Sequence, residues 1–114
     1  MVVNFFASWC VSCREQEGNL VQAYRRWGHR AAFLGIVYQD SASAASAFTR
    51  SHGGRWPDLV DPGASTAINY GVTGVPETFF INARGVVVAH TVSLQPSALR
   101  AGIVAALSTS RQRA

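Results

Sequence analysis

Lysine is absent from this sequence, and all ten of its basic residues are arginine. The arginines are scattered, apart from Arg25-Arg26 and the pair Arg111 and Arg113 near the end, and no basic stripe is interleaved with aromatic residues. Because nucleic-acid-binding domains usually carry such a stripe, the net charge of +4 does not indicate one. The sequence also has no apolar run of about 18 residues, which excludes a membrane-spanning helix within it.

We expect no signal peptide among the given residues, because the chain opens at Met1 and enters an apolar run at once. A domain seldom begins on a core strand, so we expect the natural protein to extend further upstream. The 114 residues can bury roughly two-thirds of their unfolded surface without stabilising disulfides or metal ions, and 48% of them are apolar. We therefore expect one domain over residues 1–114, with a frayed tail from about residue 110 and no repeats.

Cysteine is rare: the chain has only Cys10 and Cys13, in a C-x-x-C pair. A structural zinc site needs four ligands, and the sequence has no second C-x-x-C or H-x-x-x-H pair. Covalent haem attachment needs His directly after the second cysteine, where this chain has Arg14. A structural disulfide normally joins distant residues, because closing a short loop removes little chain entropy. Redox chemistry is the favoured interpretation, and metal binding and inert thiols are the alternatives.

The cysteine pair lies between an apolar run, Val2 to Ala7, and a helical pattern. Residues i and i+3 are neighbours on a helix, so the two thiols can close and reopen a small disulfide ring. If Cys10 begins the helix, unpaired N–H groups and the helix dipole favour its thiolate and lower its pKa. The sequence therefore predicts Cys10 as the nucleophile and Cys13, one turn deeper, as the resolving thiol.

The rest of the chain alternates strand-like and helix-like segments. We expect strands at 2–7, 32–38, 77–81 and 86–92, helices at 11–27, 41–52 and from Pro96, an extended piece at 56–60, a turn at 61–63 and one or two helical turns at 65–70. Strand–helix–strand at this spacing implies a right-handed parallel crossover. The predicted fold is an α/β/α sandwich on a mixed sheet of about four strands, in the order second–first–third–fourth. Gly18 inside the first helix predicts a kink or a close helix–sheet contact.

This arrangement places the cysteine pair at the carboxyl end of a central strand, where open α/β sheets hold their sites. Two segments then resemble the thioredoxin-like superfamily, and within it the TlpA/ResA/CcmG (DsbE)-type thiol–disulfide oxidoreductases. They are VVNFFASWCVSCRE at 2–15 and YGVTGVPETFFI at 70–81, the latter similar to the G-V-x-G-x-P-E-T-F segment of the family. The resemblance covers essentially the whole chain and implies a thioredoxin-like fold without the family's N-terminal elements.

The resemblance also implies roles for residues outside the cysteine pair. Pro76 is the cis-proline that faces the disulfide, and the Val75 backbone pairs with an extended substrate peptide. Glu77 lies close to the thiols, where it tunes their pKa or moves a proton. Trp9 packs beside the motif and shields the disulfide, and Thr78 contributes to substrate binding. The alternatives are a loop-to-strand boundary for Pro76, a surface carboxylate for Glu77 and an ordinary core position for Trp9.

Three positions depart from the family pattern. Ser12 replaces a frequent Pro, Gln16 a frequent Glu and Gly18 a frequent Pro, so the redox potential of the family is not transferable to this chain. The histidines lack ligand-like spacing and are assigned to surface or packing roles: His29, His52 and His90.

The sequence thus predicts a thiol–disulfide oxidoreductase that reduces protein disulfides outside the cytoplasm, as a monomer, with no metal or other cofactor. By resemblance its client is apocytochrome c, and a membrane thiol donor re-reduces it. The alternatives are a general thioredoxin-like reductant, a disulfide donor without a dedicated client, and a non-enzymatic redox-sensing module.

Overall fold

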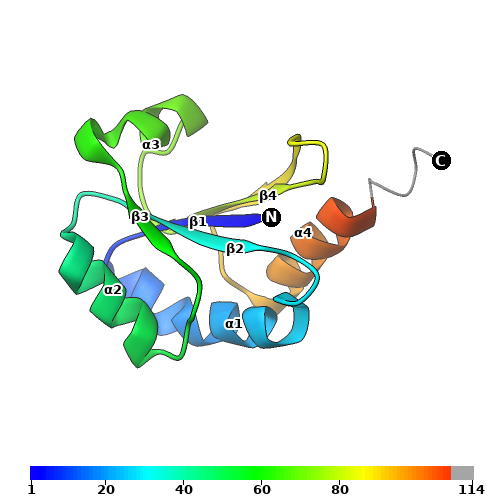
Figure 1. Cartoon of the computed structure of the whole chain (residues 1–114), viewed down its shortest axis with the longest axis horizontal. Coiled ribbons are helices and arrows are strands. Elements are labelled where there is room, and N and C mark those ends of the chain that lie inside the picture. The colour runs from blue at the N-terminus through cyan, green and yellow to red at the C-terminus, as the bar shows by residue number, and fades with distance from the viewer. Residues whose placement is uncertain (109–114) are drawn as a thin grey trace.

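The computed structural model describes residues 1–108 and forms an open sheet with helices on both faces (Figure 1). Its elements are β1 (Val2–Phe6), α1 (Val11–Trp27), β2 (Phe33–Val37), α2 (Ala42–Ser51), β3 (Asp58–Val60), a 3-10 turn η1 (Pro62–Ala64), α3 (Ser65–Tyr70), β4 (Glu77–Ile81), β5 (Val87–Thr91) and α4 (Pro96–Ser108). The predicted elements are therefore present, most of them within one or two residues of the expected bounds. The predicted frayed tail from residue 110 lies outside the described residues.

The sheet has five strands in the order β3-β2-β1-β4-β5. β1 runs parallel to β2, as expected for the crossover, and β4 and β5 form the expected antiparallel hairpin. β1 is antiparallel to β4. The predicted order of four strands is confirmed, but the count of about four was too low, because Asp58–Val60 pairs with β2 as a parallel edge strand. This strand has only three residues, and Leu59 and Val60 are half exposed, so it carries no apolar alternation that the sequence could reveal.

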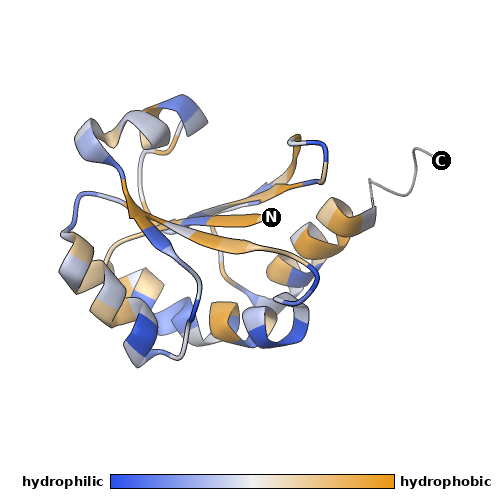
Figure 2. Ribbon diagram, in the orientation of Figure 1, coloured by the Kyte–Doolittle hydropathy of each residue, from blue (hydrophilic) through white to orange (hydrophobic). Residues whose placement is uncertain are grey.

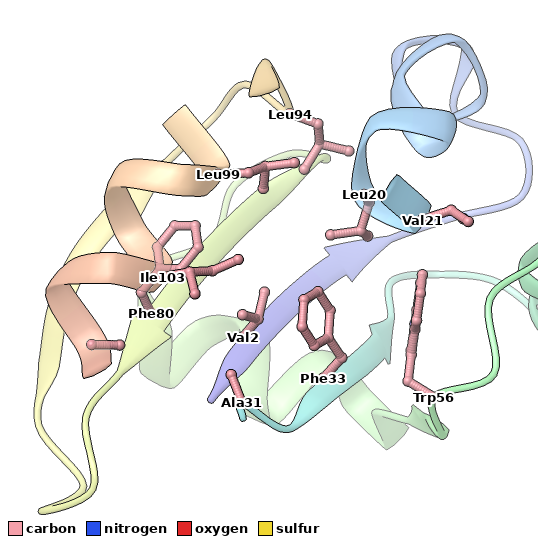
Figure 3. Packing of buried hydrophobic residues seen from close by; sticks show 11 residues of the cluster. Val2, Leu20, Val21, Ala31, Phe33, Trp56, Phe80, Leu94, Leu99 and Ile103 are labelled. Carbon is pink, nitrogen blue, oxygen red and sulfur yellow. The ribbon is translucent and has the colours of Figure 1, made fainter. Parts of the chain in front are cut away.

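The two faces of the sheet are covered unequally. Figure 1 shows α1, α2 and α4 on one face and the short α3 on the other. The central strands β1 and β2 are mostly apolar in Figure 2, as expected for strands covered on both faces. The core beneath α1 and α4 contains side chains from both helices and three strands (Figure 3), among them Leu20, Leu99, Ile103, Val2, Phe33 and Phe80.

Gly18 does not play the part that its position predicts. α1 continues without interruption from Val11 to Trp27, and Gly18 is exposed, with no atom within 4 Å of the place where a Cβ would lie. The prediction of a kink or a close contact is wrong, because Gly18 lies on the solvent face of the helix. Its neighbour Glu17 instead lies on the inner face, together with Leu20 and Val21.

Candidate functional site

The cysteine pair begins α1. Cys10 is the N-cap residue, with extended backbone angles, and the N–H of Cys13 donates to Cys10 Sγ over 3.0 Å. The two residues form a disulfide, with Cα atoms 5.2 Å apart. A backbone N–H and the positive end of the helix dipole both face the Cys10 sulfur, and both favour a thiolate there after reduction. The predicted start of the helix at Cys10 is thus confirmed.

The two sulfurs differ in their access to solvent. Cys10 retains 5% exposure, whereas Cys13 has none. Around both lies an apolar cluster from β1, β2 and α2 that includes Phe6, Val37 and Phe48. A partner thiol can therefore approach Cys10 but not Cys13, which agrees with the predicted roles of nucleophile and resolving thiol.

A loop before β4 faces the disulfide. The Val75–Pro76 peptide bond is cis, and the Val75 carbonyl oxygen lies 3.6 Å from Cys10 Sγ. Beside it is an open hollow of about 360 Å³, lined by both the start of α1 and this loop, with Ser12, Gln16 and Pro76 among its residues. The hollow and the exposed edge of the loop offer room for an extended peptide next to Cys10. The role of Val75 and Pro76 in binding a substrate stays a prediction.

Trp9 lies largely in solvent. Its side chain is 53% exposed, and its indole N–H donates to the carbonyl oxygen of Gln39 over 2.9 Å. This exposure rules out an ordinary core position. It also leaves most of the shielding of the disulfide to the apolar cluster, so the predicted shielding role of Trp9 is not supported, whereas contact with a substrate remains a prediction.

Asp40 joins the loop that carries Trp9 to the loop after β2. Its Oδ2 accepts hydrogen bonds from the Ser8 N–H at 2.8 Å and the Ser8 hydroxyl at 2.6 Å, and its Oδ1 accepts one from the Ser41 N–H. Partial desolvation acts to raise the pKa of Asp40, but these hydrogen bonds outweigh it and hold the pKa below 3.8. Asp40 thus fixes the backbone immediately before Cys10.

Replacing Asp40 with alanine is expected to lower the free energy of unfolding by about 1 kcal/mol near pH 7, because three hydrogen bonds to a partly exposed carboxylate are lost. The folded-state pKa is depressed, so this contribution is present above pH 3.8 and disappears as the pH falls through the folded-state value. Urea unfolding near pH 7 and near pH 3 measures both parts, with the exposed Ser43→Ala as control. An equal loss at both pH values contradicts this role.

Glu77 is held by two partners. Its Oε1 lies 2.8 Å from His90 Nε2, and its Oε2 accepts a hydrogen bond from the Thr73 N–H. The side chain is 12% exposed and lines the hollow beside Pro76, so it is not a freely solvated carboxylate. His90 also stacks on Phe79, with ring centroids 4.5 Å apart. The influence of Glu77 on the thiols stays a prediction.

Thr78 does not occupy the place expected of a substrate-binding residue. Its side chain has no exposure, and its hydroxyl donates to Asn4 Oδ1 over 3.0 Å, across the β1–β4 pair. Because side chains alternate along a strand, Thr78 points to the sheet face opposite Glu77 and Phe79. This burial gives no support to substrate contact by the Thr78 side chain, and the substrate-binding role of Thr78 stays a prediction.

Comparison with known families identifies the chain. It matches the AhpC/TSA family over residues 1–90. The chain belongs to the AhpC/TSA family. This AhpC/TSA-family chain is 36% identical over 87 residues to the thiol:disulfide interchange protein DsbE of Allochromatium vinosum, covering 75% of the chain and 47% of that protein. It is 31% identical over 108 residues to the thiol:disulfide interchange protein CycY of Rhizobium leguminosarum, covering 93% of this chain and 57% of that protein.

Solved structures agree with the fold. A thioredoxin-family thiol:disulfide interchange protein from Chlorobium tepidum superposes on the AhpC/TSA-family chain with a TM-score of 0.78 and 28% identity, covering 92% of this chain and 77% of the other. The predicted thioredoxin-like fold and the resemblance to DsbE-type proteins are thereby confirmed. The chain spans about half the length of the curated relatives that it matches.

The AhpC/TSA-family chain also has a buried acidic residue next to the cysteines that the sequence analysis missed. Glu17 is only 1% exposed, and its Oε1 has no hydrogen-bond partner. Burial raises the pKa of Glu17 to about 8, and the negative charge of Asp58 adds to this effect. The available signal was the helical spacing, since residue 17 falls four residues after Cys13 on the same face.

Two further findings concern other kinds of site. Among residues 1–108, no group of three or more His, Cys, Asp or Glu side chains is placed to hold a metal ion. None of the helices in this described part is both long and apolar enough to cross a bilayer.

Proposed function

We propose that this chain is a thiol–disulfide oxidoreductase domain with Cys10 as nucleophile and Cys13 as resolving thiol. The observation that carries the proposal is the geometry at Cys10, whose sulfur accepts the Cys13 N–H at the start of α1. The names of the curated relatives, which are thiol:disulfide interchange proteins, support it.

The reaction transfers two electrons from the domain to a client disulfide. The Cys10 thiolate attacks one client sulfur, which forms a mixed disulfide and releases the other client sulfur as a thiolate. Cys13 then loses its proton and attacks Cys10 Sγ, which forms the Cys10–Cys13 disulfide and releases the second client thiolate. An extended client segment beside Val75 would hold the mixed disulfide in place by backbone hydrogen bonds.

The finer assignment is also a proposal. We infer a reductant that works outside the cytoplasm, with apocytochrome c as client and a membrane thiol donor as the source of electrons. It is supported by the resemblance of the cysteine segment and of Val75-Pro76-Glu77 to the DsbE-type pattern. The exposed hollow beside the disulfide fits a peptide client, whereas a small-molecule client would not need so open a surface.

Trapping the mixed disulfide tests the proposal. Reduced Cys13→Ser protein is mixed with an oxidised peptide that carries a C-x-x-C-H haem-attachment sequence, and separately with insulin. We expect a covalent adduct of one peptide per protein, seen by mass spectrometry without reductant, and none with Cys10→Ser. Preference for the haem-attachment peptide over insulin supports the dedicated client, and equal trapping favours a general reductant. No adduct with either partner overturns the proposed exchange activity.

A further inference from the structure

The structure has an acidic cluster that the exchange reaction described above does not use. We propose that Glu17 exchanges a proton with Cys13 during the resolving step, and that Asp58 connects Glu17 to solvent on the α2 side of the domain. The inference rests on the proposed function and adds to it the group that takes up the proton of the buried thiol.

Cys13 and Glu17 lie on consecutive turns of the inner face of α1. They are 0% and 1% exposed, and the next inward residues, Leu20 and Val21, are apolar. Helical side chains lean toward the N-terminus of their helix, so the Glu17 carboxyl extends toward the turn of Cys13. Glu17 is therefore the ionisable side chain of the inner face that lies nearest to the resolving thiol along the helix, and its Oε1 has no hydrogen-bond partner.

Few charged groups face Glu17 from the surrounding elements. β1 and β2, against which the inner face of α1 packs, have no ionisable side chain, and α4 has only the exposed Arg100. From β3 comes Asp58, whose charge acts on Glu17, and from α2 comes Arg50, which acts on Asp58. The loop between α2 and β3 adds two groups that bind backbone carbonyl oxygens there or in α2: His52 and Arg55.

The position of Asp58 depends on a glycine. Asp58 pairs with Gly35 across the β2–β3 ladder, and a Cβ at Gly35 would overlap the Asp58 Oδ1 atom and approach the Phe6 ring to 2.9 Å. The carboxylate therefore lies over the bare backbone of β2, on the side of the sheet that Phe6 shares with the cysteine pair. Asp58 is near enough there for its negative charge to act on Glu17.

Three buried side-chain oxygens of this region lack a well-formed hydrogen bond. They are Glu17 Oε1, Asp58 Oδ1 and Thr49 Oγ1. Buried polar atoms are normally paired. The Thr49 hydroxyl is near enough to act on the Asp58 carboxylate, which leaves Glu17 Oε1 as the oxygen of the three with no partner. Asp58 and Thr49 also line an open pocket of about 500 Å³ beside Arg50 and Arg55. None of its lining residues belongs to the hollow beside Pro76, so protons and clients would use different surfaces.

The chemistry balances in both directions. During resolution, Cys13 gives its proton to the Glu17 carboxylate, attacks Cys10 Sγ and releases the client thiolate. When a reductant later attacks Cys10, the sulfur of Cys13 leaves as a thiolate and takes a proton from the Glu17 carboxyl. The pKa of Glu17, raised to about 8 by burial and by Asp58, lies close to that of an ordinary thiol at about 8.5, so the transfer costs little free energy.

A two-phase reaction with one equivalent of 5,5′-dithiobis(2-nitrobenzoate) tests this inference. Attack of the reduced protein releases a first thionitrobenzoate as Cys10 is labelled, and resolution by Cys13 releases a second, both visible by stopped-flow absorbance. Glu17→Gln is expected to leave the first phase unchanged and to slow the second on the order of 10-fold to 100-fold at pH 8 and above, where wild-type Glu17 is ionised and can accept the proton. The inflection of the second phase near pH 8 is expected to disappear.

Controls separate this inference from the proposed function. Glu15→Gln, an exposed change on the same helix, should behave as wild type in both phases. Asp58→Asn removes the charge that raises the Glu17 pKa, so it should move the inflection of the second phase to lower pH, and it decides the case if Glu17→Gln does not fold. An unchanged second phase in Glu17→Gln, or an unmoved inflection in Asp58→Asn, overturns the role of Glu17. Loss of either phase in the wild-type protein overturns the proposed function instead.

Discussion

Cys10→Ser protein is expected to lose disulfide-reducing activity on the order of 1,000-fold or more, because a serine hydroxyl stays protonated at neutral pH and does not attack sulfur. The structure sharpens this expectation, since Cys13 is fully buried and cannot replace Cys10 as the outer nucleophile. Cys13→Ser should also lose turnover, but it should keep one stoichiometric attack through Cys10.

Insulin reduction with dithiothreitol as electron source measures the turnover of the three proteins, and thionitrobenzoate release measures the single attack. Far-ultraviolet circular dichroism and unfolding of reduced protein control for folding. Cys10→Ser protein that keeps more than about a tenth of wild-type turnover would contradict the assigned nucleophile. Equal single-attack rates in Cys10→Ser and Cys13→Ser would contradict the difference in access between the two sulfurs.

Glu17→Met protein is expected to be more stable than wild type, and increasingly so as the pH rises. The folded state keeps Glu17 protonated up to about pH 8, whereas the unfolded chain ionises it near pH 4.5. Between these values the folded state binds the extra proton, so the wild-type free energy of unfolding falls with pH. A rise of the Glu17 pKa from 4.5 to about 8 corresponds to a loss of at most about 5 kcal/mol of unfolding free energy at high pH. Local relaxation around the ionised carboxylate should reduce this loss to roughly 2–3 kcal/mol.

Urea unfolding of the oxidised proteins near pH 5 and near pH 8 measures this difference. Methionine has a similar volume and no polar atom to leave unpaired, and Glu15→Gln is the exposed control on the same helix. We expect a small gain for Glu17→Met at the lower pH and the larger gain at the higher one. A gain that does not depend on pH would show that Glu17 ionises in the folded protein as it does in the unfolded chain.

Local residue patterns alone predict the bounds of several elements. β4 and the short α3 have the expected bounds, and Ser41 caps α2 through the N–H of Ala44 as its residue type indicates. The placement of Cys10 and Cys13 follows from one strand-to-helix junction, so spacing alone was enough. The cis geometry of Pro76 came from family resemblance, because no local property of the chain separates it from an ordinary X-Pro bond.

What the sequence could not supply depends on contacts between distant segments. The partner of Glu77 is His90, which reaches it only through the register of the β4–β5 hairpin and its irregularity near Phe80. The burial of Glu17 depends on how α1 rotates over the sheet, and its neighbour Asp58 belongs to an edge strand too short to recognise. The sequence analysis therefore did not single out Glu17, which three-dimensional packing makes part of the interior.

Gly35 has a practical consequence for comparing this chain with its relatives. Any larger residue there would displace the carboxylate of Asp58, so the two positions are expected to change together. A relative with glycine at the position of Gly35 and an acidic residue at that of Asp58 could keep the two neighbouring carboxyl groups. A relative with alanine or valine at the position of Gly35 would need another group to take up the proton of its resolving cysteine. The residues at positions 35 and 58 together therefore divide homologous chains into those that can keep this acidic pair and those that cannot.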